Sequence, residues 1–265
     1  MHEQRDWFRL DGRHALIGGA TQGIGRACAL ALARAGARVT ITGRNDEGLA
    51  KVAAELAAIG PGHATLLVDH ADWQAVQRSV DALAARDPVQ VVVHNTGGPA
   101  AGFAIDADPA QFTAALTQHV ATGQAIMQAC APGMRAAGYG RLVSITSTSV
   151  ATPLRGLGVS NVVRAAVANW VRTLAHELGR FGITANNVMP GFTRTGRLAS
   201  LFEGKARRGG VEVEDIEREA IATIPAARIA EPDEIAAAVL FLCSPAASYV
   251  NGVNLPVDGG RLVQM

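Results

Sequence analysis

The chain has 265 residues, of which 49% are hydrophobic and 18% are charged, and its formal net charge at pH 7 is +1. This composition supplies material for a large core, and the small net charge argues against a nucleic-acid-binding protein, which usually carries a strong basic excess. No apolar run reaches the roughly 20 residues that span a bilayer, and the polar residues 1–6 do not open a signal peptide. We therefore expect a cytoplasmic protein with no membrane or nucleic-acid partner.

The three cysteines, Cys28, Cys130 and Cys243, lie in separate apolar segments. An odd, scattered count without a CxxC pair favours buried thiols in a reducing compartment over disulfides. The same spacing predicts no metal site.

The first predicted unit is an apolar strand over residues 14–18, a glycine-rich turn over 18–25 and a helix over 26–34 that ends near Gly36. Small residues in such a turn let the backbone approach a diphosphate, and the helix N-terminus favours its negative charge. The unit therefore indicates dinucleotide binding. An ordinary glycine-rich turn between a strand and a helix is the alternative.

The second predicted strand, over residues 38–42, ends at Gly43 and Arg44. In dinucleotide folds an acidic residue about 20 positions after the glycine turn bonds the ribose 2′-hydroxyl of NAD. Gly43 stands there instead, and a neighbouring guanidinium suits the 2′-phosphate of NADP. The pair favours NADP(H) over NAD(H); the alternative is that Arg44 is a solvated residue at a helix start.

The rest of the chain continues the alternation of strands and helices. Further helices are predicted over 46–58, 73–85, 109–134, 159–180 and 232–243, and further strands over 64–68, 89–93, 141–147, 183–189 and 253–257. The β-branched run 89–93 is typical of a central parallel strand buried on both faces. The pattern predicts one α/β domain over residues 1–265: a Rossmann-type, doubly wound parallel sheet of about seven strands with helices on both faces.

Two segments depart from this pattern. The helix over 109–134 is interrupted by polar residues around His119. Residues 196–225 carry a basic cluster followed by an acidic one, and we expect a loose insertion there. The basic cluster suits an anionic substrate such as an acyl thioester or a carboxylate, or else a solvated loop or a subunit contact.

A candidate site follows the fifth predicted strand. Ser147 ends that strand, and Ser160 and Arg164 stand four residues apart, which places them on one face of the next helix. Two hydroxyl groups and a permanent cation can therefore converge on one point.

Taken together, these motifs resemble the short-chain dehydrogenase/reductase family over nearly the whole chain, with its 3-oxoacyl-carrier-protein reductase-like branch the most similar. The resemblance rests on the turn 19–25, Asp69, the Asn95-Thr96-Gly97 triplet, Ser147, Pro190-Gly191, Thr195 and the closing Asp258-Gly259-Gly260. It implies cofactor contacts at these positions. With Arg44 from the previous argument, the expected cofactor-binding residues are Gly19, Thr21, Gln22, Ile24, Gly25, Arg44, Asp69, Asn95, Gly97, Arg164, Gly191, Thr193 and Thr195.

The catalytic positions depart from the family pattern. By the family's spacing, Ser160 occupies the position of the proton-donating Tyr and Arg164 that of the Lys four residues later, while Ser147 matches and His119 falls near the position of an Asn. The chain has two tyrosines, Tyr139 and Tyr249, and neither is placed to substitute. A serine hydroxyl is far less acidic than a phenol of pKa ~10, and Arg164 stays protonated.

The expected catalytic residues are therefore Ser147, Ser160, Arg164 and His119, since a histidine has a suitable intrinsic pKa of ~6.5. A buried or solvent-facing helix histidine is the alternative for His119. The leading interpretation is an NADP(H)-dependent oxidoreductase with non-standard proton chemistry, in which His119 or a water supplies the proton. A lyase, dehydratase or isomerase on the same fold and a purely binding or regulatory protein are the alternatives. The resemblance also implies that the insertion over 196–225 is a substrate loop and that the chain forms a homotetramer or homodimer.

Overall fold

A parallel sheet of seven strands forms the centre of the computed structural model, which describes residues 6–264. Its strands follow the order β3-β2-β1-β4-β5-β6-β7, and every pairing is parallel. The strands are β1 (His14–Ile17), β2 (Arg38–Gly43), β3 (Ala64–Leu67), β4 (Val91–His94), β5 (Gly140–Ile145), β6 (Ile183–Pro190) and β7 (Asn254–Val257). The chain reverses its direction of travel between β1 and β4, which is the doubly wound arrangement that the sequence predicts.

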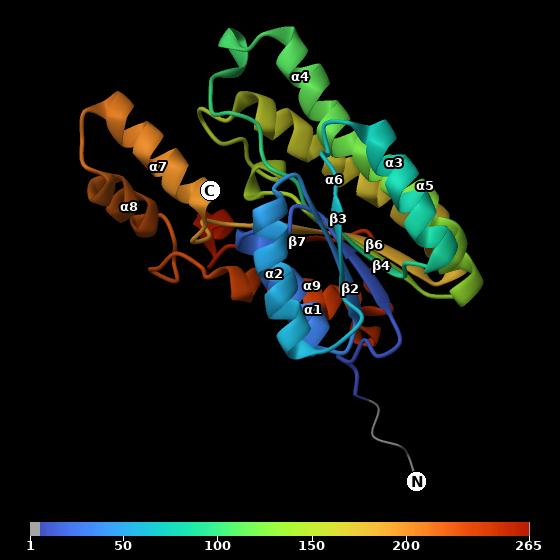
Figure 1. The fold of residues 1–265 in the computed structure, drawn as a ribbon. Helices are drawn as coiled ribbons and strands as arrows, with labels where there is room; N and C mark the ends of the chain where they lie inside the picture. The colour runs from blue at the N-terminus through green and yellow to red at the C-terminus, as the bar shows by residue number, and fades with distance from the viewer. Residues whose placement is uncertain (1–5, 265) are drawn as a thin grey trace.

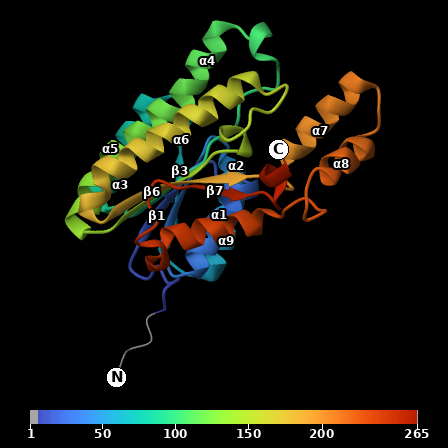
Figure 2. The same ribbon diagram turned by 180° about the vertical axis from the view of Figure 1, so that it is seen from behind.

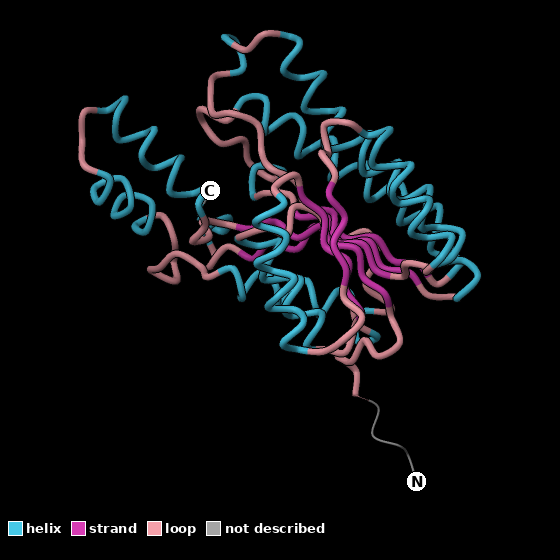
Figure 3. Tube along the Cα trace, viewed as in Figure 1, coloured by secondary structure: helices cyan, strands magenta, loops and turns pink. Residues whose placement is uncertain are grey.

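Helices cover both faces of this sheet (Figures 1, 2 and 3). One face packs against α1 (Gly23–Arg34), α2 (Asp46–Ile59) and α9 (Pro232–Cys243), and the other against α3 (Trp73–Arg86), α5 (Thr122–Ala137) and α6 (Gly158–Leu178). Neighbouring residues on a strand therefore enter different cores. Leu16 of β1 packs beneath α3, α5 and α6, whereas Ile17 packs beneath α1, α2 and α9. This two-sided burial explains why the strands read as continuous apolar runs.

The long helix expected over 109–134 is divided. It consists of α4 (Pro109–Leu116), a π-helical turn (Thr117–Ala121) and α5. Within the turn region, the Thr122 hydroxyl donates to the carbonyl oxygens of His70 at 2.7 Å and of Thr117 at 3.2 Å. The polar interruption in the sequence is thus a local widening of the helix, a feature that often occurs at functional sites.

The segment 196–225 is not loose, so this expectation is wrong. It forms α7 (Gly196–Gly209) and α8 (Val213–Ala222), which lie apart from the main body at the carboxyl edge of the sheet (Figure 1). A small apolar cluster that includes Leu198 and Phe202 holds the two helices together. The two charge clusters also meet, because Lys205 Nζ lies 3.3 Å from a carboxylate oxygen of Glu219.

All three cysteines are buried and free, as predicted. Across residues 6–264, no helix is long and apolar enough to cross a membrane.

Candidate active site

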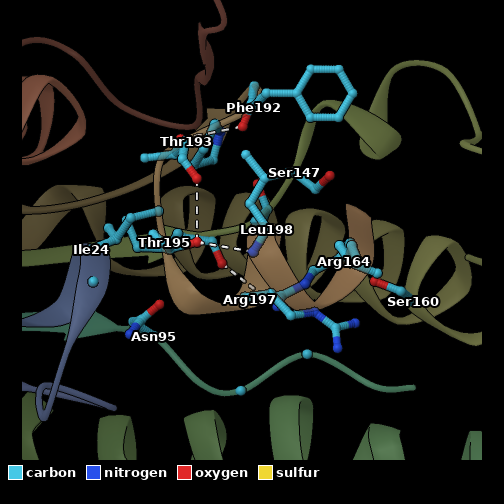
Figure 4. Close-up of a pocket in the computed structure, with 18 of the residues that line it drawn as sticks. Ile24, Asn95, Ser147, Ser160, Arg164, Phe192, Thr193, Thr195, Arg197 and Leu198 are labelled. Atoms are coloured by element: carbon cyan, nitrogen blue, oxygen red, sulfur yellow. Dashed lines mark hydrogen bonds between the residues drawn. The ribbon is translucent and has the colours of Figure 1, made fainter. Parts of the chain in front are cut away.

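A cavity of about 690 Å³ lies beyond the carboxyl ends of β1, β4, β5 and β6 (Figure 4). The structure brings most of the predicted site residues to its wall: Gly19, Gln22, Ile24, Gly25, Asn95, Gly97, Ser147, Ser160, Arg164, Gly191, Thr193 and Thr195. Four predicted residues are not among those that line it, namely Thr21, Arg44, Asp69 and His119. The cavity therefore joins the predicted cofactor positions to the predicted catalytic ones.

The glycine-rich turn after β1 leads the chain directly into α1 and exposes the first turn of that helix to the cavity. Gly19 has a φ of +56°, which favours glycine, and a β-carbon on Gly25 would overlap the carbonyl oxygen of Gly19. Within the described chain, no side chain caps α1 and no acidic residue lies in its first turn. Free backbone N–H groups and the positive end of the helix dipole therefore face the cavity, and this arrangement fits a dinucleotide diphosphate.

Asn95 fastens this turn to the end of β4. Its Nδ2 donates to the carbonyl oxygens of Gly18 at 3.0 Å and Gly19 at 3.2 Å. A side chain on either Gly19 or Gly25 would collide with this amide. Asn95 thus holds the shape of the turn as well as lining the cavity.

The residues predicted to contact the adenosine end follow β1, β2 and β3. A β-carbon on Gly43 would lie 2.7 Å from Cγ2 of Thr21. The Thr21 methyl group therefore leaves no room for a side chain at position 43. Arg44 is exposed directly after Gly43, and Asp69 is exposed after β3, where its Oδ1 accepts a hydrogen bond of 3.0 Å from the Ala71 N–H. These residues lie at the same sheet edge as the cavity but outside its wall.

Ser147, Ser160 and Arg164 line the part of the cavity that lies away from Ile24 of α1 (Figure 4). Ser147 accepts a 3.1 Å hydrogen bond from the Ser149 N–H, which leaves its own O–H available as a donor. Arg164 Nη1 donates to the carbonyl oxygen of Ile145 at 2.8 Å. Burial, and then the charge of Arg197, lower the pKa of Arg164 to about 10, so Arg164 remains a cation at neutral pH.

The structure does not bring His119 to the cavity wall. Its ring is 1% exposed, and its Nδ1 lies 2.5 Å from the hydroxyl oxygen of Thr96. Burial, with smaller contributions from the charges of Arg164, His94 and His70, lowers the pKa of His119 to about 2. The imidazole is therefore neutral and holds Thr96, a cavity-lining residue, in place. His119 was expected to donate a proton because of its intrinsic pKa, but burial lowers that pKa far below neutral pH.

Neither of the two tyrosines lies near Ser160, which occupies the position of the family's proton-donating Tyr. Tyr139 is buried just before β5, at the end of the sheet opposite the cavity. Its hydroxyl donates to the carbonyl oxygen of Cys243 at 2.6 Å. Arg13 and Arg141 lie over its ring at 3.9 and 4.0 Å from the centroid. Tyr249 is fully exposed.

Sequence reasoning did not single out two arginines that line the cavity, Arg197 on α7 and Arg261 near the C-terminus. Arg197 belongs to the basic cluster of residues 194–208, whose members look alike in the sequence. Arg261 follows the closing Asp-Gly-Gly motif and stacks over Phe192 at 4.4 Å. Its position one residue after a recognised motif was a signal that could have found it.

The strand order, the uncapped helix N-terminus and the cavity beside it define a dinucleotide-binding α/β protein. A family described as enoyl-(acyl carrier protein) reductase matches residues 19–261. The chain belongs to the short-chain dehydrogenase/reductase family.

Its relatives act on diverse substrates. The chain is 32% identical to the 7alpha-hydroxysteroid dehydrogenase of Escherichia coli strain K12, with 98% of each chain covered. It is also 32% identical to the 3-oxoacyl-[acyl-carrier-protein] reductase of Pseudomonas aeruginosa, covering 95% of this chain and 98% of the relative. A solved gluconate 5-dehydrogenase-like structure from Beutenbergia cavernae with bound NADP superposes with a TM-score of 0.88, at 35% identity, over 97% of this chain and 99% of that one.

The chain also superposes on the L-sorbose reductase of Gluconobacter frateurii, solved with NADPH and L-sorbose, with a TM-score of 0.90 at 26% identity. That match covers 97% of this chain and 98% of the reductase. Within residues 6–264, no group of three or more His, Cys, Asp or Glu side chains is arranged to hold a metal ion.

Proposed function

We propose that the protein is an NADP(H)-dependent oxidoreductase that interconverts a carbonyl and a hydroxyl group with non-standard proton chemistry. The observation that carries this proposal is the single cavity that joins the α1 N-terminus to Ser147, Ser160 and Arg164. The curated relatives support it, because their names describe dehydrogenases and reductases.

The preference for NADP(H) over NAD(H) rests on the residues that follow β2. Gly43 removes the acidic side chain that would repel a 2′-phosphate, and the adjacent Arg44 is exposed and able to bind it. Two of the superposed structures contain NADP or NADPH, which supports the same preference. Thr21 favours it indirectly, because its methyl group occupies the space that an acidic residue at position 43 would need.

When bound, the nicotinamide donates or accepts the hydride. We assign Ser147 and Ser160 to orienting the substrate oxygen by hydrogen bonds. Arg164 holds the nicotinamide ribose and stabilises negative charge on that oxygen as the carbonyl is reduced. The proton reaches the oxygen from a water in the cavity, because the serine hydroxyls are too weakly acidic, Arg164 stays protonated and His119 is buried.

The absence of a phenol beside the cavity favours a second candidate. Two serine hydroxyls and Arg164 form a set of donors suited to stabilising an oxyanion, which a lyase, dehydratase or isomerase also needs. A binding or regulatory protein that retains the nucleotide cavity fits the same residues.

Cofactor binding and turnover separate these candidates. We expect NADPH to quench the fluorescence of the three tryptophans at lower concentration than NADH, and a panel of carbonyl substrates to consume NADPH. Binding of neither cofactor contradicts the oxidoreductase. Conversion of a substrate without any change in the NADPH absorbance supports the non-redox enzyme, and tight NADPH binding without conversion of any substrate supports the binding protein.

We also propose that the chain assembles as a homotetramer or homodimer. Val162 on α6 and Leu116 on α4 are apolar residues that are 48% and 37% exposed, and a subunit contact would cover them. Light scattering coupled to size-exclusion chromatography measures this state directly. The cytoplasmic location stays a prediction.

A further inference from the structure

Arg164 and Arg197 approach the same point in the cavity from different elements. A β-carbon placed on Gly98 would lie 3.5 Å from Nη2 of Arg164 and 3.6 Å from Nη2 of Arg197. Arg164 comes from α6 and Arg197 from the first turn of α7, and Figure 4 shows both side chains among the residues that line the cavity. Two permanent cations thus flank one small space on the wall of the cavity.

Each of these side chains is held in place by a neutral group. Arg164 donates to the carbonyl oxygen of Ile145, and Arg197 Nη2 donates to that of Pro99. A carbonyl oxygen orients a guanidinium but does not cancel its charge. Burial lowers the pKa of Arg164, and the charge of Arg197 adds a smaller contribution in the same direction, as expected for two cations with no carboxylate between them.

The surrounding carboxylates are bound elsewhere. The cavity wall, as far as the described residues form it, contains three arginines and no Asp or Glu. Three acidic residues of α8 pair with other cations: Asp215 with Arg218 at 3.1 Å, Glu217 with Arg194 at 3.4 Å, and Glu219 with Lys205 at 3.3 Å. The protein therefore keeps its own carboxylates away from Arg164 and Arg197, which leaves an anion from outside to neutralise the pair.

We propose that Arg197, together with Nη2 of Arg164, binds the carboxylate of a small oxo acid or hydroxy acid, while the other N–H groups of Arg164 serve the Ile145 carbonyl oxygen and the nicotinamide ribose. This proposal rests on the proposed oxidoreductase and names its substrate class. Planar guanidinium groups match the two oxygens of a carboxylate, and charge-assisted hydrogen bonds of this kind are the strong ones.

The position of the pair limits the size of the acid. Ser160 precedes Arg164 by one helical turn, and Ser147 follows Ile145, the hydrogen-bond partner of Arg164, by two residues. Because the serines and the arginine pair line one cavity, a small molecule can place its oxygen at the serines and its carboxylate at the arginines, which suits a 2-oxo or 3-oxo acid and its hydroxy form. Leu154, Leu157, Leu198 and Leu201 supply apolar surface to the same cavity, which suits an apolar substituent on the acid.

The cofactor diphosphate is the other anion available to these arginines. The turn around Ile24 is already shaped for a diphosphate, and Figure 4 places Ile24 and Arg164 at opposite ends of the labelled residues. The test must nevertheless distinguish the two anions.

The first measurement is binding, which does not depend on turnover. Calorimetric titrations of oxalate, malonate and succinate are performed on the protein saturated with NADP⁺, with malonamide as the neutral analogue. We expect at least one dicarboxylate to bind, malonamide not to bind, and Arg197→Gln to weaken dicarboxylate binding by about tenfold or more. Arg197→Lys, which keeps the charge without the planar fork, should give an intermediate loss.

Arg207→Gln is the matched control, because Arg207 is exposed on the same helix and does not line the cavity. It should bind dicarboxylates as the wild type does. The proposal is overturned if no dicarboxylate binds the wild type, or if Arg197→Gln binds it unchanged. It is also overturned if Arg197→Gln weakens NADP⁺ itself and leaves dicarboxylate binding intact, because the arginine then serves the cofactor.

The second measurement is turnover of 2-oxo and 3-oxo acids against their methyl esters. We expect kcat/KM for the acids to exceed that for the esters by about tenfold or more, and Arg197→Gln to remove this difference. Consumption of NADPH with neutral carbonyls and no preference for acids overturns the carboxylate site while the oxidoreductase stands. Arg197-dependent dicarboxylate binding without NADPH consumption by any substrate supports the site and contradicts the oxidoreductase.

Discussion

Arg164 is tied to the strand that carries Ser147, because its Nη1 donates a 2.8 Å hydrogen bond to the carbonyl oxygen of Ile145 at the end of β5. One edge of the guanidinium is occupied by the strand and the other faces the cavity. The side chain can therefore fix both the end of β5 and whatever binds beside it. A lysine at this position would provide a charge but only a single nitrogen for both contacts.

A Tyr at position 160 should therefore raise the rate of carbonyl reduction only when Arg164 is replaced by Lys in the same variant. We expect Ser160→Tyr combined with Arg164→Lys to raise kcat for carbonyl reduction by about tenfold or more, because general acid catalysis typically contributes 10²–10⁴-fold. The pH profile of kcat should also gain a decline at alkaline pH, where the phenol loses its proton.

The matched control for this variant is Ser160→Phe with Arg164→Lys, which adds the same ring without the hydroxyl group. It should show neither the gain nor the alkaline decline. An equal gain in both variants means that the ring packs against the substrate and that proton donation does not limit the wild-type enzyme.

Cofactor preference should depend on Arg44. We expect Arg44→Ala to weaken NADPH binding by about tenfold, as loss of a charge-assisted hydrogen bond does, and to leave NADH binding unchanged. Fluorescence titration with both cofactors measures this. Lys51→Ala removes an exposed cation from the neighbouring helix α2 and controls for the loss of general positive charge; an equal loss in this variant contradicts a specific role of Arg44.

Conversion to NADH should need two changes, because Thr21 and position 43 share one space. Gly43→Asp alone places a β-carbon 2.7 Å from the Thr21 methyl and should lower stability. Adding Thr21→Ser removes that methyl and keeps the hydroxyl group. We expect the double variant to recover the melting temperature and to bind NADH more tightly than NADPH. If the double variant recovers its melting temperature but still binds NADPH more tightly than NADH, the adenosine ribose does not lie beside position 43.

The sequence predicted the order of the elements well, because burial on both sheet faces leaves a strong local pattern. Strand segments such as residues 89–93 are mostly apolar, and glycine-rich turns mark the starts of several helices. The segment 196–225 was misjudged for the opposite reason. Its helices α7 and α8 bury one small apolar cluster between them. Most of their other residues are charged or polar, so the composition of the segment does not reveal the apolar face of either helix.

The candidate site could be assembled only in part. Ser160 and Arg164 share a helix, so their spacing predicted their common face. The approach of Arg197 to Arg164 depends on how α7 lies over the loop after β4, and no local pattern encodes that contact. The burial of His119 likewise follows from the π-helical turn that directs its ring toward Thr96.

Asn95 should matter more for the shape of the glycine turn than for contact with the cofactor. Its amide donates to two carbonyl oxygens, Gly18 and Gly19. Asn95→Ala should lower the free energy of unfolding by about 1–3 kcal/mol, since it leaves these acceptors without a donor. Asn95→Asp should cost more, because a carboxylate oxygen then faces the carbonyl oxygens.

Urea unfolding and NADPH titration of both variants measure this effect. The expected result is that cofactor affinity falls in the same order as stability. A loss of affinity with unchanged unfolding contradicts the structural role and assigns Asn95 to direct cofactor contact.

Three buried histidines behind the cavity should make the protein sensitive to mild acid. Burial lowers the pKa of His70 to about 4, of His94 to about 3 and of His119 to about 2. Each pKa lies below the usual ~6.5, so the unfolded chain takes up protons below pH ~6.5 while the folded protein does not. Stability from these groups is therefore complete above that pH and declines as the pH falls toward 4.

Each histidine contributes a slope of up to about 1.4 kcal/mol per pH unit in this range. We expect His119→Asn to reduce the pH dependence of the free energy of unfolding between pH 6.5 and 5 by about this amount. Urea unfolding at several pH values provides the measurement. His176→Asn changes an exposed histidine on α6 and should leave the slope unaltered.

The same variant decides the catalytic role of His119. If the buried ring only supports Thr96, His119→Asn should keep the shape of the pH profile of kcat and lower its height by less than the 10²–10⁴-fold that a lost proton donor typically costs. A loss in that larger range at pH 7, with an unchanged melting temperature at that pH, would make His119 the proton donor after all. The folded protein would then have to open the packing around Thr96 during turnover, because the ring is 1% exposed in the closed arrangement.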